Sequence, residues 1–159
     1  MLTTRGELFA CGDPRSDRHE HGLAATRFVI RKQAWEAAVI SFISSARIVV
    51  VIAGLTPGLR TELDEIHNRG YTGKTILVFP PSKREAMRRR VEAVAAHLGP
   101  MFDVPPRGKL LAAVVRHERW VPICSRATDG LDYACALRRA VRELDERGAG
   151  QLAGNGAQS

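Results

Sequence analysis

Aromatic residues, cysteines and long apolar runs are all scarce in this 159-residue chain, and each shortage excludes a class of protein. Aromatic side chains make up only 6% of the sequence, so a stacking platform for single-stranded nucleic acid is not visible. The three cysteines, Cys11, Cys124 and Cys135, lie far apart without metal-finger spacing, which argues against a zinc site and for a reducing, cytoplasmic location. The longest apolar region, 34–55, is interrupted by charged and polar residues, so neither a membrane span nor a signal peptide is expected.

Positive charge, by contrast, is abundant. The net charge is +7 and the sequence pI is near 10.0, which favours attraction to nucleic acid, anionic lipid or phosphorylated ligands without choosing among them. The arginines are scattered over several segments and form no single basic tract. Nucleic acid is therefore the least favoured partner, and its binding would require an affinity that falls steeply with salt.

Apolar periodicity divides the chain into alternating strands and helices. A continuous apolar run at 47–53 is typical of a central strand that helices cover on both faces. The run at 74–81, closed by Pro80 and Pro81, predicts a second buried strand. Ser82 and Glu85 form a capping-box pattern at the start of a helix over 82–99. The remaining elements are expected as strands at 8–11, 27–30, 109–115 and 120–124, helices at 33–45, 59–68 and 132–146, and a Gly-rich disordered tail at 148–159.

This order of elements predicts a single three-layer α/β domain over residues 1–147, flavodoxin-like in outline. Buried strands that alternate with helices are typical of a mostly parallel sheet, here of about five strands, with helices on both faces. The last two strands are candidates for an antiparallel hairpin at one edge. In such sheets ligands bind outside the carboxyl ends of the strands, so a ligand site is expected there.

The sequence Thr56-Pro57-Gly58 turns the chain off the end of one predicted strand and into a helix. Thr56 is a favourable N-cap, Pro57 suits the first helical position, and Gly58 lets a ligand approach the backbone. Glu62 lies on the flank of the helix's apolar stripe, where we expect it to be half-buried. Burial raises the pKa of such a carboxyl, whereas the helix N-terminus lowers it. The alternative is an ordinary solvated acid, which is common near helix starts.

A second turn follows the first predicted strand and supplies two more candidate ligand-binding residues. Gly12 permits close approach of a phosphate or ribose, and Asp13 accepts hydrogen bonds from hydroxyls. Because parallel strands place their following loops on one edge of the sheet, we expect this turn to rim one crevice with Gly54, Thr56 and Glu62. The turn lacks the glycine pattern of a dinucleotide-binding loop, so a plain strand-ending turn is the alternative.

The strand followed by "GLTPGLRTELDEI" and "GKTILVFPP" resembles an uncharacterised bacterial α/β domain, often fused behind membrane helices, near the TIR-like and nucleoside 2-deoxyribosyltransferase-like folds. The resemblance runs from the first strand to the helix of Tyr133 and includes Trp35 on the preceding helix. Thr61 departs from it, because such sequences commonly carry a tryptophan there. Two further departures are the lack of an aspartate just before the helix and of membrane helices before the domain.

The resemblance implies two kinds of function. In enzymatic members of the wider groups a glutamate acts on the ribose side of an N-glycosidic bond, a role that here would fall to Glu62. A carboxylate suits this chemistry because it stabilises or attacks the oxocarbenium-like sugar. The substrate would be NAD or a nucleoside, and no cofactor or metal is expected. Other members are non-catalytic interaction or signalling modules, which implies a homo-oligomer or a protein partner and indifference to Glu62.

Overall fold

A computed structural model describes residues 9–12, 26–29, 32–105 and 107–154. The chain divides into two compact units, Met1–Ser45 and Ala46–Ser159. In the first unit, strands β1 (Phe9–Gly12) and β2 (Thr26–Val29) pair in parallel as a two-stranded sheet, and helix α1 spans Lys32–Ser45. The apolar stripe predicted for α1 is present, with Val39 and Ile43 buried.

The second unit contains a four-stranded sheet and three long helices. Its elements in chain order are β3 (Val49–Ile52), α2 (Pro57–Asn68), the 3₁₀ helix η1 (Tyr71–Lys74), β4 (Thr75–Val78), α3 (Arg84–Leu98), β5 (Lys109–Arg116), β6 (Arg119–Ser125) and α4 (Gly130–Gly154).

The sheet of the second unit is mixed, which corrects the expectation of a mostly parallel, five-stranded sheet. Its order is β3-β4-β5-β6, and only β3 and β4 are parallel, whereas β4 with β5 and β5 with β6 are antiparallel. The α/β class itself is confirmed. The predicted hairpin also forms, because His117 and Glu118 both adopt positive φ (47° and 63°) and reverse the chain between β5 and β6.

Strand β3 is not the central strand that its apolar run predicted. Among the described strands it lies at the edge of its sheet, where Val49 and Val51 are buried but Val50 and Ile52 are 45% and 65% exposed. The neighbouring β4 matches its prediction, with Ile76 and Leu77 fully buried. A continuous apolar run therefore does not distinguish a central strand, which is buried on both faces, from an edge strand such as β3, which is buried on one face only.

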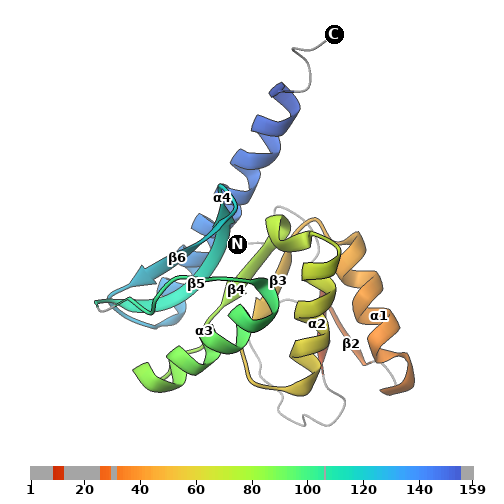
Figure 1. Ribbon diagram of the computed structural model, residues 1–159, viewed down its shortest axis with the longest axis horizontal. Coiled ribbons are helices and arrows are strands. Elements are labelled where there is room, and N and C mark those ends of the chain that lie inside the picture. The colour runs from red at the N-terminus through yellow and green to blue at the C-terminus, as the bar shows by residue number, and fades with distance from the viewer. Residues whose placement is uncertain (1–8, 13–25, 30–31, 106, 155–159) are drawn as a thin grey trace. The chain divides into compact units, whose positions relative to one another are not determined.

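Helices cover both faces of this sheet (Figure 1). Helix α4 packs on one face, where it forms a buried cluster of small and branched side chains: Ile76, Leu111, Ala112, Val114, Ile123, Ala136, Ala140 and Leu144. Helices α2 and α3 pack against each other on the opposite face. Their buried side chains are Leu59, Leu63, Ile66, Met87, Val91, Val94 and Leu98.

The helix ends differ from their predictions in two places. The N-cap of α3 is Lys83, and no side chain caps the helix. The Ser82 hydroxyl is buried and has no hydrogen-bond partner among the described residues, so the predicted capping box does not form. Helix α4 begins earlier than predicted, because the carboxylates of Asp129 and Asp132 each accept a hydrogen bond from the other residue's backbone N–H group. It also ends later than predicted, at Gly154. No helix in the described part of the chain is long and apolar enough to cross a membrane.

Candidate functional site

Three of the four strands of the mixed sheet end at the same edge. Strand β5 is antiparallel to both of its neighbours, so β6 runs in the same direction as β3 and β4. Helices α2, α3 and α4 follow these three strands, and each begins at this carboxyl edge (Figure 1). Helix starts present unpaired N–H donors and partial positive charge, so this edge is suited to anions.

Helix α2 begins with the residues that the sequence predicted. Thr56 is its N-cap, with an extended backbone (φ −79°, ψ 147°), and Pro57 lies in its first turn. The Thr56 side chain makes no capping hydrogen bond, so the first N–H groups of α2 receive no partner from it. At Gly54 an added Cβ would meet its nearest neighbours at 3.9 Å, so packing does not require glycine there.

A pocket of about 310 Å³, the α2–α3 pocket, lies between these two helices. Its polar side chains are Thr56, Arg60 and His97, and the loop before α2 also contributes Gly54 and Leu55. Its apolar lining consists of Leu59, Leu63, Ala93 and Ala96. The volume is at the lower end of the range for small-molecule sites, roughly 300–1,000 Å³, and an apolar surface with a few polar groups is typical of such sites.

His97 is held by a carboxylate from the facing helix. Its Nδ1 lies 2.5 Å from Oδ1 of Asp64, and the two side chains are 22% and 55% exposed. A carboxylate only accepts hydrogen bonds, so Nδ1 carries the proton in this contact. In the neutral imidazole Nε2 then keeps its lone pair and is a hydrogen-bond acceptor. Sequence reasoning missed this pair because its members are 33 residues apart and meet only when α2 packs on α3.

Glu62 lies on the opposite flank of α2 from this pocket. Successive helical residues are rotated by about 100°, which places Glu62 about 200° around the helix from Arg60. Its side chain is half-buried, as the sequence predicted, and desolvation by burial raises the pKa of its carboxyl. Among the described residues, no hydrogen bond or ion pair is found for this carboxyl. No contact within the described part of the chain therefore offsets the cost of burying the Glu62 carboxylate.

Replacing Glu62 by glutamine is expected to stabilise the protein at neutral pH. Because the pKa of Glu62 is higher in the folded state, the folded chain binds more protons than the unfolded chain, and its stability falls as the pH rises through that folded pKa. Below about pH 4 both states are protonated and the difference disappears. Thermal unfolding of Glu62→Gln and wild type at pH 4 and pH 7 checks this. The matched control is Glu118→Gln in the exposed β5–β6 turn, and an equal shift at both pH values would contradict the prediction.

The end of β4 is fixed from both faces of the sheet. The Tyr133 hydroxyl donates to the Phe79 carbonyl at 2.6 Å, and Arg90 Nη1 donates to the Pro80 carbonyl at 2.9 Å. Burial raises the pKa of the Tyr133 hydroxyl, and the charge of Arg90 partly opposes this rise. The phenol therefore stays a neutral hydrogen-bond donor, and the carboxyl edge beside the site is held in place by α3 and α4.

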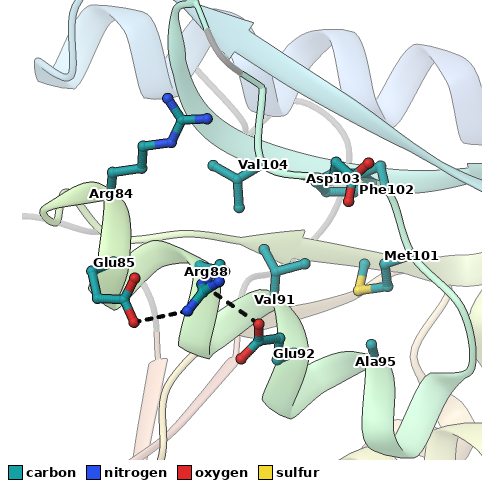
Figure 2. A pocket seen from close by; sticks show the side chains of 10 residues that line it. All are labelled: Arg84, Glu85, Arg88, Val91, Glu92, Ala95, Met101, Phe102, Asp103 and Val104. Atoms are coloured by element: carbon teal, nitrogen blue, oxygen red, sulfur yellow. Dashed lines mark hydrogen bonds and ion pairs between the residues drawn. The ribbon is translucent and has the colours of Figure 1, made fainter.

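A second, larger groove of about 660 Å³ runs along α3, on the side where Met101–Val104 forms the facing wall (Figure 2). Arg88 crosses its floor and pairs with Glu85 at 3.2 Å and with Glu92 at 3.6 Å. Acidic side chains outnumber basic ones among its lining residues, which are Arg84, Glu85, Arg88, Val91, Glu92, Ala95, Met101, Phe102, Asp103 and Val104. This groove is therefore less suited to an anion than the α2–α3 pocket.

The structure brings together only part of the predicted site. Gly54 and Thr56 line the α2–α3 pocket, whereas Gly58 and Glu62 do not. Gly12 ends β1 in the other unit, and Asp13 lies outside the described residues. The predicted crevice that joins Gly12 and Asp13 to the start of α2 thus stays a prediction.

No family model, curated protein or solved structure matches the chain. The resemblance to TIR-like domains is therefore still a prediction.

Proposed function

We propose that this chain binds a small anionic, nucleotide-like ligand in the α2–α3 pocket. The observation that carries the proposal is that Arg60, the uncapped start of α2 and an apolar lining all belong to one pocket at the carboxyl edge of the sheet. Arginine and helix N–H groups are the usual partners of phosphate in proteins. The apolar lining suits the flat, weakly polar part of such a ligand.

The charge of the whole chain supports the same conclusion. A net charge of +7 raises the local concentration of anions and speeds their association. No ion pair in the described part of the chain engages Arg60, so its guanidinium is available to a ligand. Asp64, which contacts the lining residue His97, is paired with that histidine and not with Arg60.

Arg60→Ala is expected to weaken the binding of AMP roughly tenfold, because one charge-assisted hydrogen bond is worth about 1.5–3 kcal/mol and part of it is screened by solvent. Isothermal titration calorimetry of the full chain with AMP and with inorganic phosphate at low salt measures the effect.

The matched control is Arg142→Ala, which removes the same charge from an exposed position on α4. Equal weakening by both variants would show that only the overall charge matters, and the absence of any AMP binding to the wild type would overturn the proposal.

A second candidate function is cleavage or transfer of an N-glycosidic bond through Glu62. The observation that favours it is a half-buried carboxyl with a raised pKa and no partner among the described residues, since such costly carboxyls are enriched at functional sites. Glu62 faces away from the α2–α3 pocket, so this activity would use a different approach to α2. The two proposals are therefore tested separately.

A further inference from the structure

We propose that His97 is a specificity-determining residue of the α2–α3 pocket and that it selects phosphate esters that carry a hydroxyl group, such as ribose phosphates. This inference rests on the proposed anion binding and adds a second requirement to it. Arg60 and the start of α2 would hold the anion, while His97 would accept a hydrogen bond from a ligand hydroxyl.

The geometry of the Asp64–His97 pair supports this role. In the neutral imidazole, the 2.5 Å contact with the Asp64 carboxylate places the proton on Nδ1 and leaves Nε2 as the acceptor. Among the described side chains that line the pocket, His97 and Thr56 are able to accept a hydrogen bond, whereas Arg60 only donates, and of the two acceptors His97 is the one held by a second side chain. A ligand hydroxyl, which donates a hydrogen bond, satisfies this acceptor.

The burial of the two partners separates their roles. His97 is 22% exposed and lines the pocket, whereas Asp64 is 55% exposed and does not line it. Asp64 is thus a positioning residue that acts through His97. Loss of an oriented acceptor is costly to specificity, because a site built to hydrogen-bond a hydroxyl rejects the analogue that lacks it.

The test compares AMP with 2′,3′-dideoxyadenosine 5′-monophosphate, which lacks both ribose hydroxyls. We expect the wild-type chain to bind AMP roughly three- to tenfold more tightly, the range of one neutral hydrogen bond. His97→Phe should bind both compounds equally. The matched control is His67→Phe, which replaces an exposed histidine on α2 that does not line the pocket, and it should keep the preference for AMP.

Two variants of Asp64 keep the test informative if a histidine variant fails to fold. Asp64→Ala should lose most of the preference for AMP, whereas Asp64→Asn, whose side-chain oxygen still accepts from Nδ1, should keep more of it. A preference for AMP that survives His97→Phe would overturn this inference and leave the anion site intact. If neither compound binds, or if Arg60→Ala changes nothing, it is the proposed function that fails.

Discussion

Replacing Phe79 by alanine is expected to lower the free energy of unfolding by about 3–5 kcal/mol, as for other fully buried aromatic residues. Phe79 follows β4 at the carboxyl edge, its side chain is completely buried, and its ring packs edge-to-face on Phe102 with the ring centroids 6.5 Å apart. Its N–H donates to the Leu111 carbonyl and its own carbonyl accepts from Tyr133. Truncation to alanine leaves a cavity at the point where the end of β4 contacts β5 and α4.

Urea unfolding followed by circular dichroism measures this loss. The control is Leu131→Ala, which truncates a side chain that is 73% exposed and should change the free energy of unfolding by no more than about 0.5 kcal/mol. Because whole domains are stable by only about 5–15 kcal/mol, Phe79→Leu serves as a milder variant if the alanine variant is unfolded. A loss below about 1 kcal/mol for Phe79→Ala would contradict the assignment of Phe79 to the core.

Helices could be predicted from this sequence because apolar periodicity depends only on which face of a helix is buried. Leu59, Leu63 and Ile66 are buried as their spacing requires. Strand direction could not be predicted in this way. The apolar run of β5 reflects burial on both faces, and such a run is the same in a parallel or an antiparallel strand. The antiparallel hairpin of β5 and β6, which turns at His117 and Glu118, was predicted, whereas the antiparallel pairing of β5 with β4 was not.

The candidate site was partly predictable for a similar reason. Capping chemistry is local, so Thr56 and Pro57 could be placed at the start of α2 from the sequence. Arg60 and His97 reach one pocket only because α2 packs against α3, and nothing in the local sequence of either helix indicates that contact. For Glu62, the position on the flank of α2 and the partial burial could be predicted from the sequence, but its separation from the pocket could not, because the pocket forms only where α2 meets α3.

Glu62 is the position at which the largest change in activity is expected. If the chain releases nicotinamide from NAD or a base from a nucleoside, Glu62→Gln should lower the rate by roughly 100-fold or more, the usual cost of removing one group that stabilises charge in a transition state. The amide has the same shape as the carboxyl but has no negative charge to stabilise an oxocarbenium-like sugar and is a poor nucleophile. Shape and packing are thus kept while the chemistry is removed.

Stability makes this experiment decisive. Since Glu62→Gln is expected to be more stable than the wild type at pH 7, a loss of base release by this variant cannot be explained by unfolding. Chromatographic detection of free nicotinamide or free base gives the rates, with Glu118→Gln as the control for the loss of one exposed negative charge. Equal rates in Glu62→Gln and wild type, or no release by any of the three proteins, would remove the catalytic role of Glu62. A non-catalytic interaction module would then be favoured, and it would be recognised by concentration-dependent oligomers that Glu62→Gln leaves unchanged.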